Sequence, residues 1–269
     1  KSLGPDCHEP GRDRNFPPGR EGNKMPEIGS SNQGPRDVIV AADFPNREAL
    51  EAFLDSLGET KPYLKVGMEL FYGAGPDMVR SLKERGYKVF LDLKLHDIPN
   101  TVSSAMSVLS DLGVDMVNLH AAGGKKMMER ALAGLTRPDG SRPLLIAVTQ
   151  LTSTSQEVMN QELGIPGSVE DSVASYALLA KEAGLDGVVC SPLEAETVKE
   201  ACGAQFLTVT PGVRFGDSSL DDQVRVMTPA AAREASSDYI VVGRPITQAK
   251  NPLSAYQRAR QEFLGESGE

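Results

Sequence analysis

The sequence contains no tryptophan and has only three cysteines and three histidines among its 269 residues. Cys7, Cys190 and Cys202 are odd in number and lack the spacing of metal ligands, so neither a disulfide framework nor a cysteine metal site is expected. Cys190 lies in an apolar stretch that is typical of a buried free thiol. A free thiol of this kind indicates a reducing compartment, and we therefore expect a cytoplasmic protein.

Long apolar runs and an excess of positive charge are also missing. No apolar run approaches the roughly 18 residues that a membrane span needs, and the amino-terminal segment has no apolar signal-peptide core, so we expect no membrane association. The formal net charge is −9, which argues against non-specific binding to nucleic acid. A small anionic substrate stays open, provided that particular Arg and Lys residues supply positive charge at its site.

The first 36 residues differ in composition from the remainder of the chain. They contain six prolines and six glycines with few large apolar side chains. Such a segment cannot bury enough surface to offset the entropy lost on ordering. We expect a disordered leader over residues 1–36, with Met25 as one candidate natural start and no function assigned to the segment.

From residue 37 onward the chain alternates between short apolar segments and amphipathic segments. The apolar segments are typical of buried parallel strands and cover residues 37–43, 63–68, 89–95, 115–121, 143–149, 187–191, 206–210 and 239–243. The amphipathic segments predict helices over residues 47–57, 76–85, 99–112, 125–135, 168–183, 192–201, 228–235 and 252–264.

Eight strands alternating with helices predict an α/β fold, a single-domain (β/α)8 TIM barrel over residues 37–269. The alternative is a doubly wound open sheet. That fold usually places a glycine-rich phosphate loop after the first strand, where this chain reads Ala-Asp-Phe-Pro-Asn-Arg (42–47). The missing glycines favour the barrel.

The third strand carries two charges within its apolar run. Alternate strand residues share a face, so Asp92 and Lys94 point the same way, and Asp97 follows just beyond the strand. Charges in a buried strand are costly unless they are paired or used. The pattern Asp-x-Lys-x-x-Asp therefore indicates an active site, with a structural ion pair at the barrel mouth as the alternative.

Further polar residues occur near the carboxyl ends of the other predicted strands, where barrel enzymes place their catalytic groups. They are Asp43, Lys65, His120, Thr149, Thr152, Arg214 and Arg244. The segments Thr-Pro-Gly-Val-Arg (210–214) and Gly-Arg-Pro-Ile-Thr (243–247) follow the seventh strand and the eighth, where barrels commonly bind phosphate. Surface arginines that cap helices are the alternative. The polar stretch 215–223 is consistent with a mobile lid.

Histidines give little support for a metal site. His120 has no cysteine or second histidine at ligand spacing, and we favour a structural role for His96. A divalent ion held by carboxylates such as Asp43, Asp92 and Asp97 stays open, although Lys94 already supplies positive charge among them.

Eight segments together carry a family resemblance. They are Leu-Lys-Val-Gly-Met-Glu (64–69), Phe-Leu-Asp-Leu-Lys-Leu-His-Asp-Ile-Pro-Asn-Thr (90–101), Val-Asn-Leu-His-Ala-Ala-Gly-Gly (117–124), Ala-Val-Thr-Gln-Leu-Thr-Ser (147–153), Leu-Asp-Gly-Val-Val-Cys-Ser (185–191), Val-Thr-Pro-Gly-Val-Arg (209–214), Asp-Gln-Val-Arg-Val-Met-Thr-Pro (222–229) and Val-Gly-Arg-Pro-Ile-Thr (242–247). The sequence resembles the bacterial branch of the orotidine 5′-phosphate decarboxylases from about residue 38 to residue 263.

The resemblance implies a role for each site residue. Lys94 would deliver a proton to C6 of the pyrimidine as carbon dioxide leaves, Asp92 would flank the departing carboxylate, and Asp97 would reach the partner's site in a homodimer. The remaining substrate-binding residues would be Asp43 and Lys65 at the ribose, Ile98 and Thr101 after the third strand, Thr152 at the pyrimidine, and Arg214, Gln223, Gly243 and Arg244 at the phosphate.

The resemblance also implies that the reaction, the last step of de novo UMP synthesis, needs no metal and no organic cofactor. Two rivals remain within the same superfamily: a metal-dependent sugar-phosphate decarboxylase and a hexulose-phosphate synthase, which share the Asp-x-Lys-x-x-Asp strand. A catalytically silent phosphate-binding barrel is a rival of another class.

Overall fold

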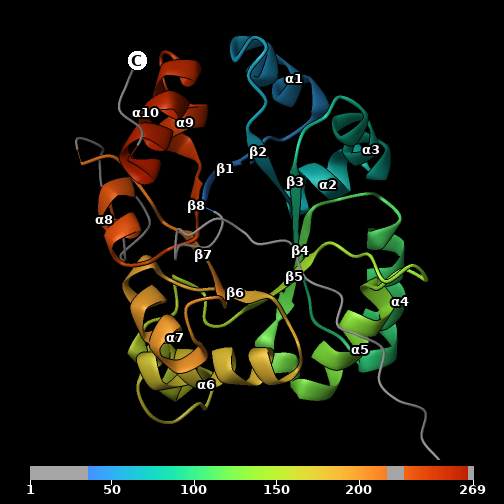
Figure 1. The fold of residues 1–269 in the computed structure, drawn as a ribbon, viewed down its shortest axis with the longest axis vertical. Coiled ribbons are helices and arrows are strands. Elements are labelled where there is room, and N and C mark those ends of the chain that lie inside the picture. The colour runs from blue at the N-terminus through green and yellow to red at the C-terminus, as the bar shows by residue number, and fades with distance from the viewer. Residues whose placement is uncertain (1–35, 217–226, 266–269) are drawn as a thin grey trace, which may run out of the picture. The chain divides into compact units, whose positions relative to one another are not determined.

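Eight parallel strands close into a barrel in the computed structural model, which describes residues 36–216 and 227–265 (Figure 1). Each strand pairs with the next along the chain, and β8 pairs with β1, which confirms the predicted TIM barrel. The strands are β1 (Asp37–Ala41), β2 (Tyr63–Gly67), β3 (Val89–Leu95), β4 (Met116–His120), β5 (Leu144–Val148), β6 (Gly187–Val189), β7 (Leu207–Pro211) and β8 (Tyr239–Val242).

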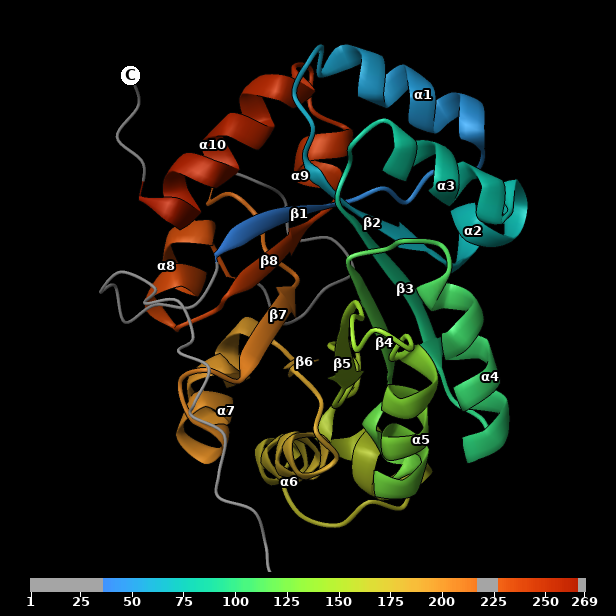
Figure 2. The same cartoon turned by 45° about the vertical axis from the view of Figure 1, so that its right-hand side comes forward.

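Helices surround the barrel, as the two views in Figures 1 and 2 show. The α-helices are α1 (Arg47–Ser56), α2 (Met68–Ala74), α3 (Pro76–Glu84), α4 (Pro99–Ser110), α5 (Lys125–Leu135), α6 (Val169–Glu182), α7 (Ala195–Cys202), α8 (Pro229–Glu234), α9 (Arg244–Thr247) and α10 (Pro252–Leu264). Three further helical segments are η1 (Ala121–Gly123), the π-helix η2 (Val158–Glu162) and η3 (Pro192–Glu194). None of the helices in the described ranges is long and apolar enough to cross a membrane.

Two α-helices escaped the sequence prediction. Helix α2 begins directly after β2. The residue at its cap position is Gly67, which has no side chain to accept a hydrogen bond, so the sequence does not mark the change from strand to helix. Helix α9 is only four residues long. Helix α1, in contrast, has a side-chain cap, because the Asn46 side chain accepts a hydrogen bond from the backbone N–H of Ala49.

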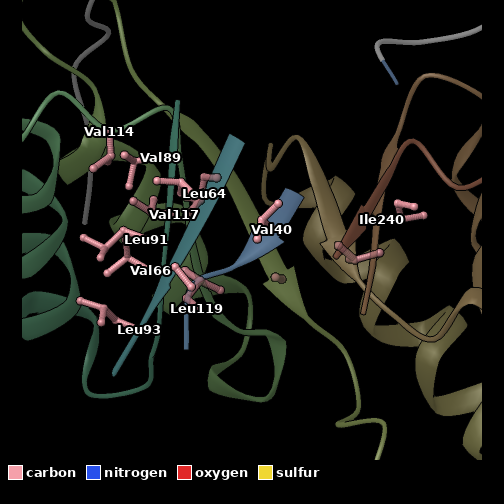
Figure 3. Close-up of a cluster of buried hydrophobic side chains, with 14 of the residues drawn as sticks. Val40, Leu64, Val66, Val89, Leu91, Leu93, Val114, Val117, Leu119 and Ile240 are labelled. Atoms are coloured by element: carbon pink, nitrogen blue, oxygen red, sulfur yellow. The ribbon is translucent and has the colours of Figure 1, made fainter. Parts of the chain in front are cut away.

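Alternation along the strands separates two hydrophobic clusters. Outward-facing side chains such as Val40, Leu64 and Leu91 pack between the strands and the surrounding helices (Figure 3). The residues between them face inward, and a separate cluster inside the barrel contains Ile39, Phe90, Met116, Ile146, Leu207, Val209, Tyr239 and Val241. The barrel is therefore a packed core and not a pore.

The inward alternation becomes polar toward the carboxyl ends of three neighbouring strands. Lys65 follows Tyr63 by two residues on β2, and Asp92 follows Phe90 in the same way on β3. On β4 the corresponding residue is Asn118. The fold thus places three polar side chains side by side above an apolar layer.

Strand β3 contains an irregularity next to Lys94. Leu91 of β3 pairs with Val117 of β4, and Leu95 pairs with Leu119. Strand β3 therefore spans four positions where β4 spans two, and it bulges out of the regular ladder. Lys94 itself has φ 50°, which lies in the left-handed region that residues with a Cβ rarely occupy. The regular alternation used to predict that Asp92 and Lys94 share a face therefore does not extend to Lys94.

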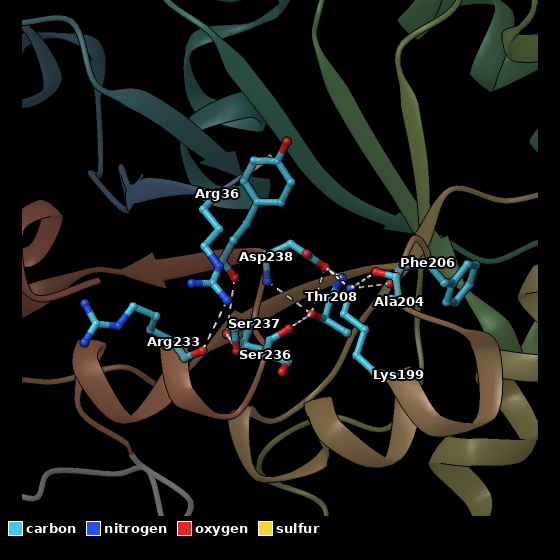
Figure 4. A network of polar contacts seen from close by, with 11 residues as sticks. Arg36, Lys199, Ala204, Phe206, Thr208, Arg233, Ser236, Ser237 and Asp238 are labelled. Carbon is cyan, nitrogen blue, oxygen red and sulfur yellow. Dashed lines mark hydrogen bonds and ion pairs between the residues drawn. The ribbon is translucent and has the colours of Figure 1, made fainter. Parts of the chain in front are cut away.

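Four carboxylates mark the opposite, amino-terminal end of the barrel. The carboxylates of Asp115, Asp186 and Asp238 each accept a hydrogen bond, at 2.7 Å, from a backbone N–H at the first or second residue of the neighbouring strand, β3, β5 and β7 respectively. Asp37 accepts one from Val38 within β1. Each also pairs with a cation: Asp115 with Lys83, Asp186 with Arg142, Asp238 with Lys199, and Asp37 with Arg260 and Lys88. Figure 4 shows the carboxylate of Asp238 in contact with both Lys199 and Thr208. We call these four residues the amino-terminal carboxylates.

Almost all of the predicted leader, residues 1–36, lies outside the described residues. Of this segment the structure describes only Arg36, whose guanidinium donates a hydrogen bond to the carbonyl of Arg233. The predicted boundary of the barrel domain near residue 37 stays a proposal.

Candidate active site

A cavity of about 550 Å³ opens at the carboxyl ends of the strands. Most of the predicted site residues line it, namely Asp43, Lys65, Asp92, Lys94, Thr152, Arg214, Gly243 and Arg244. Residues from strand ends and loops all around the barrel contribute to its wall, so the closed topology is what brings these distant segments together. The location agrees with the face on which TIM barrels place their active sites.

Four alternating charges form the polar part of the cavity floor. Lys94 Nζ lies 2.6 Å from Asp92 Oδ1, and Lys65 Nζ lies 3.4 Å from Asp92 Oδ2. Lys65 Nζ is also 2.9 Å from Asp43 Oδ1. Two carboxylates and two ammonium groups thus alternate in one row, with Asp92 held between the two lysines.

The row of charges fixes the protonation states of its two most enclosed members. Burial disfavours the charged carboxylate of Asp92, but attraction to Lys65 and Lys94 outweighs burial, so its pKa is lowered. Burial likewise opposes the ammonium of Lys65, and the carboxylates of Asp92 and Asp43 outweigh it, so its pKa is raised. Asp92 is therefore anionic and Lys65 cationic at neutral pH.

Residues after β7 and β8 form another part of the wall. Gly212 has φ 84°, a conformation that glycine adopts without strain. The side chain of Arg214 is buried, and its backbone N–H donates to the carbonyl of Met227 at 3.0 Å. Gly243 and Arg244 lie where β8 passes into α9. The two segments predicted to bind phosphate therefore face the same cavity as the row of charges.

Several predicted residues lie elsewhere. Asp97, Ile98 and Thr101 are exposed at the start of α4 and do not line the cavity of this chain. Gln223 lies outside the described residues. Of the predicted lid, residues 215–223, the structure describes only Phe215, which packs under the guanidinium of Arg258 at 4.2 Å, and Gly216.

Residues 36–259 match the sequence model of the family described as "Orotidine 5'-phosphate decarboxylase / HUMPS family". The chain belongs to this family. The matched range includes every predicted site residue, and the predicted family is thereby confirmed.

Individual relatives within the family give a finer picture. An orotidine 5′-phosphate decarboxylase from Bacillus cytotoxicus is 56% identical over 233 residues, which cover 86% of this chain and 98% of the relative. A crystal structure of orotidine 5′-phosphate decarboxylase from Lactobacillus acidophilus matches with TM-score 0.77 and 45% identity over 85% of this chain and 99% of the other. An uncharacterized conserved protein from Geobacillus kaustophilus matches with TM-score 0.75 and 50% identity over 84% of this chain and 99% of the other.

Several further residues line the cavity, and the sequence analysis gave them no role in the site. Asn118 and Gln150 are buried amides in the wall, and Ser153, Gln248 and Cys190 also contribute to it. The signal for Asn118 was available, because an amide two residues after an inward-facing Met116 lies on the inner face of the barrel. Gln150 and Gln248 lie in loops, where strand alternation gives no such signal.

The two histidines with predicted minor roles lie beside each other, outside the cavity lining. The rings of His96 and His120 are 5.7 Å apart, and burial, His96 and Lys94 together lower the pKa of His120. The hydroxyl of Thr149 donates to the carbonyl of Val189 instead of facing the cavity. Among the described residues, no three His, Cys, Asp or Glu side chains are grouped to hold a metal ion.

Proposed function

We propose that the protein is an orotidine 5′-phosphate decarboxylase, which converts orotidine 5′-phosphate to uridine 5′-phosphate and carbon dioxide in pyrimidine biosynthesis. The observation that carries the proposal is the contact of Lys94 with Asp92 in a cavity that Arg214 and Arg244 also line. A cation beside an anion suits the reacting end of the substrate, and the two arginines suit its phosphate. Membership of the family and the names of relatives that are 55–56% identical support this substrate.

Lys94 is the proposed proton donor. Loss of carbon dioxide from C6 leaves an electron pair on a carbon atom that has no evident electron sink in the pyrimidine ring. An ammonium group near C6 stabilises this developing charge and then transfers its proton to the carbon. Its proton thus replaces the departing carboxylate, so the reaction consumes one proton and releases one carbon dioxide. No step requires a metal or an organic cofactor.

Asp92 supports this chemistry in two ways. Its anionic carboxylate lies 2.6 Å from Lys94 Nζ and orients that ammonium before the reaction. The same carboxylate lies beside the substrate carboxylate in the proposed complex, so repulsion between the two favours departure of carbon dioxide. Lys65, on the other side of Asp92, limits this repulsion and holds the carboxylate in place.

The remaining residues hold the parts of the substrate that do not react. We assign the ribose hydroxyls to Asp43 and Lys65 and the pyrimidine to Thr152 and the nearby backbone. The phosphate is assigned to Arg214, Gly243, Arg244 and Gln223, with closure of the lid over residues 215–223. Binding energy from the phosphate then contributes to the transition state at the far end of the substrate.

A homodimer is the proposed assembly, because three predicted residues of the site lie outside the cavity of their own chain. Asp97 and Thr101 are exposed, and Ile98 is 66% exposed. Tyr72 of α2, at the same end of the neighbouring strand β2, is 72% exposed. We propose that these residues contact a second copy of the chain, so that Asp97 completes the partner's site and Ile98 and Thr101 contribute to substrate binding there.

Mixing two inactive variants tests this assembly. Lys94→Ala and Asp97→Asn each remove a group from the site, but a mixed dimer with shared sites contains one site with both changes and one site with neither. Random exchange of subunits then restores about a quarter of the wild-type activity. Sedimentation of the wild type measures the dimer itself. A mixture that stays inactive although its subunits have exchanged contradicts the shared site.

The decisive experiment follows the loss of pyrimidine absorbance when orotidine 5′-phosphate is added. We expect rapid loss with the wild type, and a kcat at least about 10⁴-fold lower with Lys94→Ala, since general acid catalysis and electrostatic stabilisation are lost together. Uridine 5′-phosphate should still bind the variant, because the phosphate residues are intact. Full activity of Lys94→Ala would rule out the proposed proton donor.

A chelator separates this function from its metal-dependent rivals. The description of the family also covers HUMPS members, and a divalent ion among carboxylates was left open by the sequence. We expect full decarboxylase activity after dialysis against EDTA, because Lys94 and Lys65 supply the positive charge. Loss of activity in EDTA, restored by a divalent cation, would contradict the cofactor-free reaction. We further propose that the protein works in the cytoplasm, in keeping with Cys190 and Cys202, which are thiols and not disulfides.

A further inference from the structure

We propose that Asn118 is a positioning residue for the decarboxylation: its side-chain amide holds the backbone bulge at Lys94 and the carboxylate of Asp92 at the same time. The inference rests on the proposed function, since it concerns how the proposed proton donor is held. Asn118 lies on the inner face of β4, is 1% exposed and belongs to the cavity wall.

The first contact replaces a missing bond of the sheet. Because β3 bulges away from β4 beside Lys94, the N–H of Lys94 is displaced from the regular ladder. Asn118 Oδ1 accepts a hydrogen bond from this N–H at 2.8 Å. The amide side chain therefore substitutes for a backbone carbonyl at the point where the two strands separate.

The second contact reaches the charged pair. Asn118 Nδ2 donates to Asp92 Oδ1 at 2.7 Å, and this oxygen also accepts the hydrogen bond from Lys94 Nζ. One amide thus links the main chain of Lys94 to the carboxylate that its own side chain contacts. The three groups form a closed loop of hydrogen bonds, which fixes where the ammonium points.

The two contacts determine the orientation of the amide. If the amide were rotated by 180°, its NH₂ group would face the N–H of Lys94 and its oxygen would face the Asp92 carboxylate. Both encounters would be repulsive, so only one orientation is stable. A side chain with both an acceptor and a donor is required, and an asparagine supplies them at the correct spacing.

The conformation of Lys94 explains why such support is needed. A lysine with φ 50° is strained, and it persists only where its surroundings hold it. The strained residue is also the proposed proton donor, so the strain lies at the reacting group and not at a distant turn. Relaxation of the bulge would move the Lys94 side chain away from C6, and a displacement of about 1 Å can cost about 100-fold in rate.

Two variants separate the two contacts. Asn118→Asp keeps an acceptor for the Lys94 N–H but loses the donor to Asp92, whereas Asn118→Leu has a similar shape and lacks both. We expect kcat to fall about 10–100-fold in Asn118→Asp and more than about 100-fold in Asn118→Leu. The dissociation constant of uridine 5′-phosphate should change by less than about threefold, because the phosphate residues are unaffected.

The pH profile of kcat distinguishes a positioning role from a merely structural one, because a structural role alone would leave the profile unchanged. Loss of the amide donor disfavours ionised Asp92, so its pKa rises and the acid limb of the profile moves to higher pH in both variants. Thr208→Val is the matched control, because it removes a buried polar group at the opposite end of the barrel, near Asp238. It should lower thermal stability and leave kcat and the acid limb unchanged.

Each outcome bears on the proposal. Wild-type kcat in Asn118→Leu, an unmoved acid limb, or a loss of uridine 5′-phosphate affinity in step with kcat would overturn it. If Asn118→Leu does not fold, Asn118→Asp decides by the same criteria. If the wild type fails to decarboxylate orotidine 5′-phosphate, the proposed function fails by itself. The Lys94 resonance in ¹³C-lysine-labelled protein, assigned with Lys94→Arg, then tests the positioning role, which an unchanged titration in Asn118→Asp would refute.

Discussion

The two ends of the barrel both contain aspartates paired with cations, yet they hold them in different ways. At the amino-terminal end, each carboxylate accepts a strand N–H, as Asp238 does from Thr208, and is thereby joined to the sheet. At the carboxyl end, Asp92 accepts hydrogen bonds from the side chains of Lys94 and Asn118 and faces a cavity. Pairs joined to backbone stabilise the fold, whereas pairs held by side chains at a cavity are available for chemistry.

The largest effect should follow from removing the carboxylate at the cavity. Asp92→Asn leaves Lys65 and Lys94 without the anion between them, so Lys94 loses its carboxylate partner and Lys65 keeps only Asp43. We expect kcat for orotidine 5′-phosphate to fall about 10³-fold, measured by the pyrimidine absorbance. A variant with the kcat of the wild type would show that the pair at the cavity is structural, like the pairs at the other end.

The matching change at the amino-terminal end should act on stability alone. Asp238→Asn leaves Lys199, whose side chain is only 12% exposed, without its carboxylate partner. We expect the free energy of unfolding to fall by about 3 kcal/mol, measured by urea denaturation, because an unpaired charge remains buried. The kcat should stay within about twofold of the wild type. A large loss of kcat in the folded variant would contradict the division between the two ends.

The pH dependence of stability sharpens the comparison at the cavity. The pKa of Asp92 is lowered from 3.8, because its attraction to the two lysines outweighs burial, so its contribution to folding is present above pH 3.8 and is lost as pH falls through the folded-state pKa. The pKa of Lys65 is raised from 10.5, so its contribution is present below pH 10.5 and is lost as pH rises through the folded-state pKa. Denaturation of the wild type and Asp92→Asn across pH should show both losses in the wild type. A variant curve parallel to that of the wild type at low pH would refute the role given to Asp92.

The smallest effect is expected where a pair at the amino-terminal end is partly exposed. Arg142 holds Asp186 with two guanidinium nitrogens, at 2.5 and 2.8 Å, and its side chain is 24% exposed. Arg142→Lys keeps the charge but loses the forked contact, so we expect a loss of about 0.5–1 kcal/mol in thermal or urea denaturation. Arg80→Lys, in the exposed pair with Asp77, is the control and should change stability less. Equal losses in the two variants would mean that the forked geometry contributes nothing.

Much of the fold was predictable because strand ends coincide with changes in polarity. The run 89–95 is apolar except for Asp92 and Lys94, and the structure has a strand over the same residues. Helix α2 was missed for the converse reason, because apolar residues continue from β2 into it without a capping side chain. Alternation also predicted that Asp92 and Lys94 would meet, and they do, although Lys94 lies in a bulge and not in the regular alternation.

The local geometry of the site was less accessible to sequence reasoning. A lysine with a positive φ has no sequence signal, since the conformation comes from the bulge and not from the residue. Asn118 was overlooked because an amide in an apolar strand can be assigned to the cavity only when it is known which residues of that strand face into the barrel. Asp97 was assigned to a second subunit by resemblance, and its exposure leaves that assignment a prediction.

The pairing of β1 with β8 has a consequence for how the chain folds as it is made. Asp37 of β1 lies opposite Tyr239 of β8, so the first strand pairs with the strand of the barrel that is synthesised after all the others. Until β8 leaves the ribosome, β1 and β7 have open edges that other chains can pair with. Closure is therefore a late, long-range event, and the growing chain depends on rapid folding or on chaperones to protect the edge of its first strand.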